Sequence, residues 1–446
     1  MKVLALVDGE HYPPVTRWGL ATARSMGYEV VGALLVGGVE KLAAGEVPEL
    51  GVPVWTVVGD ARSALAAAID GSAPEGVLDL SDEPVLGYRE RMELAAVALV
   101  RGVPYLGADF RLDPPISGPP LAVPALAVIG TGKRTGKTAI AGEVARTAAR
   151  LGRNPIVVAM GRGGPAAPQI AEAGSVTVER LLELVRRGQH AASDYLEDAV
   201  TTGVTTVGAR RAGGGLAGAP FVSNVRPAAE LAVRLGAGLV VLEGSGSAVP
   251  PVPWDAGILV VPASAPPEYL GGYLGPFRLL LSDVVVVTMA NSPAGLENLP
   301  ALRSHVQRLR DDARLIVTDF VPHPLGDVRG ADVFFTTTAP GPVAERQAGH
   351  LETVHGCRVV GRSARLADRA GLAEDLDGAE GYDVLLTELK AAAVDIACDR
   401  ALARGARVVF CDNRVVGVDG DADLPAVVEE TIGLAERRYG QRHEDR

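Results

Sequence analysis

One stretch near the middle of the chain constrains the fold more than any other. It reads AVIGTGKRTGKTAIAGEVARTAARLG from Ala127 to Gly152: an apolar strand, a glycine-rich turn and an amphipathic helix. Glycines in such a turn let consecutive backbone N–H groups converge on phosphate oxygens, and the helix N-terminus adds its partial positive charge. The turn Gly130–Thr138 is therefore predicted to bind phosphate. Lys137 would reach the β- and γ-phosphates of a nucleotide, and the Thr138 hydroxyl would bind Mg²⁺.

The spacing of this loop departs from the usual phosphate-loop pattern. G-x-x-x-x-G-K-[ST] requires a glycine at position 131, but Thr131 stands there and the glycine comes one place earlier. The longer GT-x-x-x-x-GKT form resembles the loop of dethiobiotin synthetase and its relatives. We predict ATP as the nucleotide, with GTP as the alternative. The predicted nucleotide-binding residues of the loop are Gly130, Gly132, Thr135, Gly136, Lys137 and Thr138.

Lysine is rare in this chain and is concentrated at the loop. Only five residues are lysine and all other basic residues are arginine, a bias that a GC-rich genome also produces. Two of the five lysines, Lys133 and Lys137, belong to the loop, where a compact ammonium suits phosphate capture. Lys133, Arg134 and Lys137 are predicted to be catalytic. Lys133 and Arg134 exceed the positive charge that a nucleotide alone needs, which indicates that the loop also faces a second, highly anionic substrate.

Polar residues follow three further apolar strands, and strand ends line the ligand crevice in open α/β sheets. Glu243 ends the strand of GLVVLEGSGS and is predicted to hold magnesium with Thr138; the alternative is a simple loop cap. Arg162 follows PIVVAM as a predicted catalytic clamp on a substrate phosphate, or as a solvated loop residue. Asn291 follows DVVVVT and would read the nucleobase, or form a turn before Ser-Pro.

Four other candidates for substrate contact lie in loops or at helix ends. Arg210 and Arg211 sit in the glycine-rich stretch Thr201–Val225, which suits closure over a polyanion, although a surface loop is the alternative. His11 and Arg89 lie in the first block of the chain. A lone loop histidine is more often structural, and Arg89 opposes the helix dipole at a helix start. A fifth candidate, Lys390, follows a late strand, where a solvated helix face is the alternative.

Strand-like and helix-like segments alternate along the whole chain, which predicts the α/β class with largely parallel sheets. Asp113–Ala125 carries five prolines and is typical of a linker. We expect three domains: an N-terminal α/β, Rossmann-like domain over residues 1–120, a central P-loop domain with a parallel sheet over 121–325, and a C-terminal α/β domain over 326–446.

Composition narrows the function classes. No apolar run reaches the roughly 18 residues of a membrane span, and the first segment meets Asp8 too early for a signal peptide, so a cytoplasmic protein is expected. Cys357, Cys398 and Cys411 form no C-x-x-C pair, which favours reduced thiols over disulfides or zinc. A net charge of −11 argues against a nucleic-acid partner. The oligomeric state stays open, with a homodimer among the expected assemblies.

The assembled motifs resemble the cyclic 2,3-diphosphoglycerate synthetase family. The resemblance rests on DGEHYPPV near the start, GTGKRTGKTA in the loop, VVLEGSGSAVPPV at the strand end and ELKAAAVD late in the chain. It implies an ATP-dependent ligase that uses Mg²⁺ and closes an intramolecular phosphoanhydride in 2,3-diphosphoglycerate. Two alternatives remain: a ligase or kinase of the dethiobiotin synthetase type with another small anion, and a nucleotide-switched partner-binding NTPase.

Overall fold

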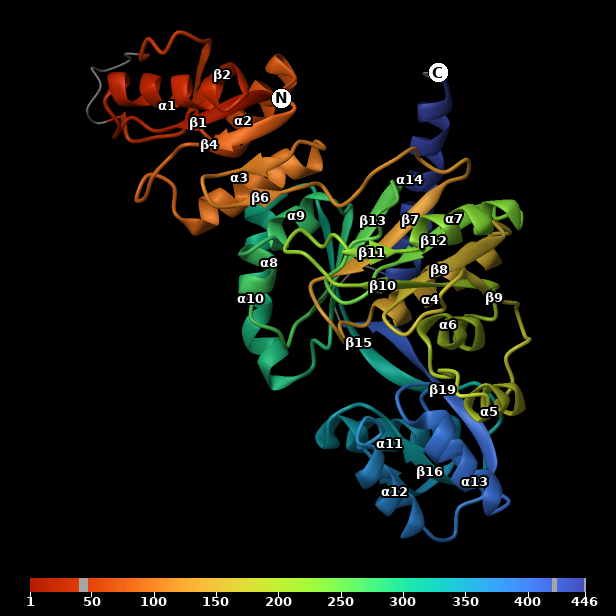
Figure 1. The fold of residues 1–446 in the computed structure, drawn as a ribbon. Coiled ribbons are helices and arrows are strands. Elements are labelled where there is room, and N and C mark those ends of the chain that lie inside the picture. The colour runs from red at the N-terminus through yellow and green to blue at the C-terminus, as the bar shows by residue number, and fades with distance from the viewer. Residues whose placement is uncertain (40–46, 419–422, 445–446) are drawn as a thin grey trace.

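The computed structural model describes residues 1–39, 47–418 and 423–444. It has two sheets, with a six-stranded sheet at one end and a thirteen-stranded sheet through the rest of the molecule (Figure 1). The predicted α/β class is therefore confirmed. The six-stranded sheet has the order β3-β2-β1-β4-β5-β6, and its neighbouring strands are parallel except for the pair β5–β6.

The first block contains short strands that alternate with three helices. Its strands are β1 (Lys2–Val7), β2 (Glu29–Leu35), β3 (Val54–Thr56), β4 (Gly76–Asp79), β5 (Tyr105–Leu106) and β6 (Arg111–Leu112). Its helices are α1 (Pro13–Ser25), α2 (Ala61–Ser72) and α3 (Tyr88–Val100). The helix α3 packs against α9 of the central block, so the first block is seated on the central one.

The central block carries the loop on a largely parallel sheet whose inner strands are buried. Its strands are β7 (Ala125–Gly130), β8 (Pro155–Gly161), β9 (Gln169–Ala171), β10 (Thr206–Ala212), β11 (Val222–Ser223), β12 (Leu239–Glu243), β13 (Ala256–Pro262), β14 (Val284–Thr288) and β15 (Arg314–Pro324). From β10 to β15 the order is β10-β8-β12-β7-β13-β14-β15, with every pair parallel. The strands are almost entirely apolar because helices cover both faces of the sheet.

The helices of the central block divide between the two faces. They are α4 (Lys137–Arg150), α5 (Val178–Arg186), α6 (Asp194–Thr202), α7 (Val225–Arg234), α8 (Glu268–Gly271), α9 (Gly275–Leu280) and α10 (Pro293–Leu309). The helices α7 and α10 contribute to one apolar core, and α4 contributes to the core on the opposite face. The helix α6 packs against α4 and against β8 and β10. The starts of α4 and α6 therefore lie near the same strand ends.

The third block continues the central sheet. Its strands are β16 (Asp332–Thr336), β17 (Arg358–Ser363), β18 (Val384–Thr387) and β19 (Arg407–Gly417). Its helical segments are α11 (Gly341–His355), α12 (Arg369–Asp377), the π-helix η2 (Ala393–Cys398), α13 (Asp399–Ala403) and α14 (Leu424–Glu444). The π-helix η2 leads directly into α13. The helix α14 packs on α4, β7 and β13 of the central block rather than on the third.

Two long strands orient the central and third blocks toward each other. β15 and β19 pair antiparallel from Thr318 to Pro324, whereas β19, β18 and β16 are mutually parallel. Strands of the central block therefore run toward the third block, and strands of the third block run back. As a result the carboxyl edges of both sheet regions face the space between the blocks, where α5 packs against η2 (Figure 1). Open α/β sheets bind ligands at such edges.

Two further findings bear on the sequence predictions. None of the described helices is long and apolar enough to cross a membrane. Cys357, Cys398 and Cys411 are free and buried. The three-domain division stays a prediction, because the continuous sheet crosses the predicted boundary at residue 325.

Candidate active site

Two of the three loop glycines, Gly130 and Gly136, have neighbours that leave little or no room for a side chain. A Cβ on Gly130 would lie 2.8 Å from the Thr135 hydroxyl and 3.1 Å from the Lys137 Nζ. Gly136 has φ +93° at the start of α4, and a Cβ there would meet the ring of Phe320 on β15. The loop is also held from below, because the Thr288 hydroxyl donates to the Thr135 carbonyl at 2.7 Å. These contacts fix the loop between the ends of β7, β14 and β15.

The buried Lys137 ammonium is held by the loop itself. Its Nζ donates to the Gly132 carbonyl at 2.7 Å and to the Thr135 hydroxyl at 3.2 Å. Burial lowers the pKa of Lys137 to about 8, while the nearby Glu243 and Asp194 carboxylates oppose that shift. The ammonium therefore lies at the position where the motif predicts that a phosphate binds.

Thr138 and Glu243 form a pair of oxygen donors beside the loop. The Thr138 hydroxyl donates to Glu243 Oε1 at 2.7 Å. Glu243 is buried, and no N–H or hydroxyl donor of a described residue reaches its Oε2. Hard oxygen ligands of this kind fit Mg²⁺. Among the described residues no group of three or more His, Cys, Asp or Glu side chains is arranged to hold a metal, so the pair fits a cation that arrives with nucleotide phosphates.

Three acids on α6, which the sequence interpretation missed, border the same crevice. Asp194, Glu197 and Asp198 are spaced i, i+3 and i+4, so they share one face of the helix. The Asp198 carboxyl lies against Glu243, and burial together with the surrounding acids raises the pKa of Asp198 well above its usual range. The raised pKa values of Asp198 and Glu243 favour their neutral forms, which reduces the repulsion between two buried carboxyl groups. The acidic spacing in SDYLED was the available signal.

Asp194 links several of the predicted cations. A Cβ on Gly161 at the end of β8 would lie 3.3 Å from Asp194 Oδ2. Burial raises the pKa of Asp194, and the charges of Lys390, Lys137, Arg162 and His190 lower it in that order. The structure therefore brings the loop, the end of β8 and the third block around one carboxylate.

The predicted pair Arg210 and Arg211 separates at the end of β10. Arg211 donates to the Ser245 carbonyl at 2.8 Å, and a Cβ on Gly246 would lie between Arg211 Nη2 at 3.1 Å and Lys133 Cγ at 3.9 Å. Burial and the neighbouring Arg162 lower the pKa of Arg211. Arg210 instead donates its Nε–H to the Gly164 carbonyl at 2.8 Å, on the other side.

Lys390 reaches the crevice from the third block. Its ammonium lies 3.1 Å from Glu197, and the charges of Glu197 and Glu388 raise its pKa against the effect of burial. Burial raises the pKa of Glu197 to about 8. Glu388 is buried and accepts from Thr337, Thr338 and Asn413, which keeps its pKa low. Lys390 therefore belongs to an ordered charge cluster and is not on a solvated helix face.

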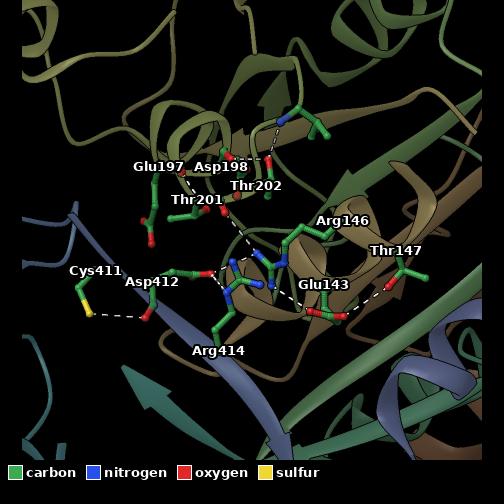
Figure 2. A network of polar contacts seen from close by, with 11 residues as sticks. Glu143, Arg146, Thr147, Glu197, Asp198, Thr201, Thr202, Cys411, Asp412 and Arg414 are labelled. Atoms are coloured by element: carbon green, nitrogen blue, oxygen red, sulfur yellow. Dashed lines mark hydrogen bonds and ion pairs between the residues drawn. The ribbon is translucent and has the colours of Figure 1, made fainter. Parts of the chain in front are cut away.

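A second polar network ties the loop helix to the third block. Arg146 on α4 donates to Asp412 Oδ2 on β19 at 3.2 Å and to the Thr201 carbonyl at 3.4 Å (Figure 2). Arg414 approaches the same Asp412 oxygen at 2.8 Å, and Glu143 pairs with Arg146 at 3.0 Å. The helix that begins at the phosphate loop is thus anchored to both α6 and β19.

Arg278 on α9 is a further site residue that the sequence interpretation missed, besides the three acids of α6. It is buried, and its hydrogen bonds go to the carbonyls of Ser247, Leu274 and Leu216. Burial lowers its pKa to about 10, and its charge contributes to the lowered pKa of Lys137. A buried cation therefore holds both the loop after β12 and the glycine-rich loop after β10.

Four predicted residues lie outside this charge cluster as far as the described contacts show. His11 pairs with Asp8 at 2.8 Å, and Arg89 Nε donates to the Tyr88 hydroxyl at 3.0 Å. Arg134 is exposed with φ +55°, and the backbone N–H of Asn291 donates to Asp319 at 3.3 Å. Their predicted roles toward substrate and nucleobase stay predictions.

The central strand β7 of a buried parallel sheet leads through a glycine-rich turn into α4, which begins with Lys137 and Thr138. This arrangement defines a P-loop nucleotide-binding protein. Models of the cyclic 2,3-diphosphoglycerate synthetase N-terminal, P-loop and C-terminal domains match residues 2–113, 125–319 and 324–414. The chain belongs to the cyclic 2,3-diphosphoglycerate synthetase family. The predicted resemblance and the predicted ligase class are thereby confirmed.

Relatives from bacteria and archaea align over nearly their whole length. Proteins named cyclic 2,3-diphosphoglycerate synthetase are 49% identical in Rubrobacter xylanophilus, over 94% of this chain and 96% of the relative, and 42% identical in Methanothermobacter thermautotrophicus, over 96% of each. The protein of that name from Thermococcus kodakarensis is 40% identical, over 98% of this chain and 99% of the relative.

Proposed function

We propose that the protein uses ATP to close the intramolecular phosphoanhydride of cyclic 2,3-diphosphoglycerate from 2,3-diphosphoglycerate, releasing ADP and inorganic phosphate. The observation that carries this proposal is the convergence of cations from separate elements on one crevice. Lys133 and Lys137 come from the loop, Arg162 and Arg211 from the ends of β8 and β10, and Lys390 from the third block. A substrate with two phosphates and a carboxylate needs this countercharge, and the names of the relatives support its identity.

In the first step, an oxygen of one substrate phosphate attacks the γ-phosphorus of ATP, and the bond to the bridging oxygen of ADP breaks. Both reactants are anionic, so repulsion is the main obstacle. Lys137, Arg162 and Arg211 reduce it by surrounding the reacting groups with fixed positive charge. Asp194 orients these cations, since it lies among Lys137 and Arg162. A bound Mg²⁺, held by Thr138 and Glu243, would supply further charge neutralisation on the phosphates.

In the second step, an oxygen of the neighbouring substrate phosphate attacks the phosphorus of the activated one. The bond to the transferred phosphoryl group breaks, and inorganic phosphate leaves. The two phosphates sit on adjacent carbons, so the attack is intramolecular, with an effective concentration on the order of 10⁵–10⁸ M for well-oriented groups. The attacking oxygens are already deprotonated, so the reaction requires neither a protein nucleophile nor a general base.

Phosphorus NMR with coupled ADP detection tests the proposal. The protein is incubated with ATP, Mg²⁺ and 2,3-diphosphoglycerate, and we expect cyclic product, ADP and phosphate in equal amounts. Lys137→Ala is the control: it should abolish product because the β/γ charge is left uncompensated. ADP formation that does not depend on 2,3-diphosphoglycerate, with no cyclic product, would refute the proposal. It would favour another small anion or a nucleotide-switched partner instead.

A further inference from the structure

A polar cavity opens beside the crevice, between the ends of β8 and β10 and the start of α6. Its volume is about 290 Å³, and its wall includes Gly163, Gly164, Gln189, His190, Tyr195 and Arg210. The elements that form it lie next to one another in the fold (Figure 1). Neither the nucleotide loop nor the predicted phosphate clamp Arg162 forms part of the wall. The cavity is therefore a separate compartment, two strands away from the loop strand β7.

The position of Arg210 in this cavity is fixed from two directions. Its Nε–H donates to the Gly164 carbonyl at 2.8 Å, and its backbone N–H donates to Asn224 Oδ1 at 2.6 Å. The Asn224 amide in turn donates to the carbonyls of Pro165 and Ala166 at 3.2 and 3.0 Å. One asparagine thus ties the strand end to the glycine-rich wall. The guanidinium is held by its inner nitrogen, which leaves the terminal nitrogens for a ligand.

The cavity is matched to an anion of low charge. Its wall contains one guanidinium, the His190 imidazole and several neutral polar groups, and none of the described residues that line it is Asp or Glu. The His190 ring lies over Gly163, where a Cβ would be 2.9 Å from its Cδ2. Asp194 adjoins the cavity, because its chain neighbours Ser193 and Tyr195 line the wall, and a Cβ on Gly161 at the end of β8 would lie 3.3 Å from Asp194 Oδ2. A ligand in the cavity is therefore adjacent to the reacting groups.

We propose that this cavity holds the carboxylate end of the substrate, with Arg210 as its specificity-determining contact. The inference rests on the proposed function and adds the orientation of the substrate. A planar monoanion fits the fork of one guanidinium. The two phosphates, which carry more charge, then extend toward Arg162, Arg211 and Lys137. The adjacent arginines at the end of β10 bind different groups of the substrate: Arg211 binds the phosphates and Arg210 binds the carboxylate.

A ligand-and-variant cycle tests this assignment by titration calorimetry. The wild type and Arg210→Gln are each titrated with 2,3-diphosphoglycerate and with propane-1,2-diol bisphosphate, which lacks the carboxylate. We expect the wild type to bind the analogue about tenfold to a hundredfold more weakly, because a hydrogen bond to a charged group is lost. Arg210→Gln should bind both ligands with similar, weak affinity, and its ATP affinity should be unchanged. Arg187→Gln, an exposed arginine at the end of α5 paired with Glu183, is the charge-matched control and should behave as wild type.

His190→Gln is a second variant that tests the assignment if Arg210→Gln does not fold, because it leaves the Arg210 contacts to Gly164 and Asn224 in place. It should weaken 2,3-diphosphoglycerate binding by a smaller factor and reduce the difference between the two ligands. If Arg210→Gln folds and keeps the wild-type ratio between the ligands, the assignment is overturned. If Arg210→Gln does not fold, the assignment is overturned when His190→Gln keeps the wild-type ratio of affinities between the two ligands. Wild-type binding without cyclic product would refute the proposed function alone, and no wild-type binding would overturn both.

Discussion

The Lys137 ammonium shows how burial tunes a single residue of the loop. Its pKa is lowered to about 8, so the free protein holds it charged at neutral pH and loses the charge as the pH rises through that value. We expect the dissociation constant for ATP to increase about tenfold between pH 7 and pH 9, because only the ammonium attracts the phosphates. Fluorescence titration with ATP over this range measures the effect.

The control for this pH dependence is Lys137→Arg. A guanidinium stays charged throughout the range, so the variant should bind ATP more weakly overall but with a flat profile. Equal slopes for wild type and Lys137→Arg would show that another group titrates.

Arg278 supports a prediction about stability and geometry together. Replacing it with methionine removes the charged donor from the carbonyls of Ser247 and Leu216, while the Leu274 carbonyl keeps the backbone N–H of residue 278. We expect a loss of about 1.5–3 kcal/mol in the free energy of unfolding, because hydrogen bonds from a charged donor to these carbonyls are lost. Urea unfolding measures this loss. The KM for the phosphorylated substrate should also rise, since both loops that flank Arg211 lose their anchor; an unchanged KM would confine Arg278 to a structural role.

At the scale of elements, α6 explains most of what the sequence interpretation missed. Its acids are spaced for one helix face, but the sequence does not show that this face turns toward the loop rather than toward solvent. The contact with α4 decides this, and it arises from packing across β8 and β10. Glu243 and Arg162 could be selected from the sequence because they end or follow buried strands, and the parallel order of these strands places their ends at one edge of the sheet.

A largely buried ion pair links α4 to β19, the strand that pairs antiparallel with β15. Arg146 and Asp412 are 14% and 7% exposed, and Arg414 shares the same carboxylate. Asp412→Ala should lower the free energy of unfolding by about 1.5–3 kcal/mol, because Arg146 and Arg414 lose the carboxylate they share while Arg146 keeps Glu143. Guanidinium chloride unfolding is the measurement. Asp377→Ala removes an exposed acid paired with Arg400 and should cost less than about 1 kcal/mol. Equal losses would contradict the role of the pair.

At the scale of the whole molecule, the sequence predicts the α/β class, the parallel central sheet and the loop, because periodicity and glycine spacing are local signals. It does not predict that the sheet continues into the third block, since strand pairing across a long insertion leaves no local trace. For the same reason α14 was assigned to the third block, although its apolar residues Leu424, Val427 and Ile432 pack into the core beneath α4. Lys390 was identified as a candidate only because lysine is rare.

The opposed carboxyl edges lead to a prediction about the whole molecule. If substrate and nucleotide occupy the crevice between them, binding should protect backbone amides in both the loop 130–138 and the segments 336–341 and 387–390 of the third block. Hydrogen exchange with mass spectrometry, with and without a non-hydrolysable ATP analogue, Mg²⁺ and 2,3-diphosphoglycerate, measures this protection. The outer helix α12 serves as the internal reference and should not change. In Lys137→Ala the protection should be lost at both edges together, because the nucleotide no longer binds. Protection restricted to the loop would show that the third block supports the site without enclosing the substrate.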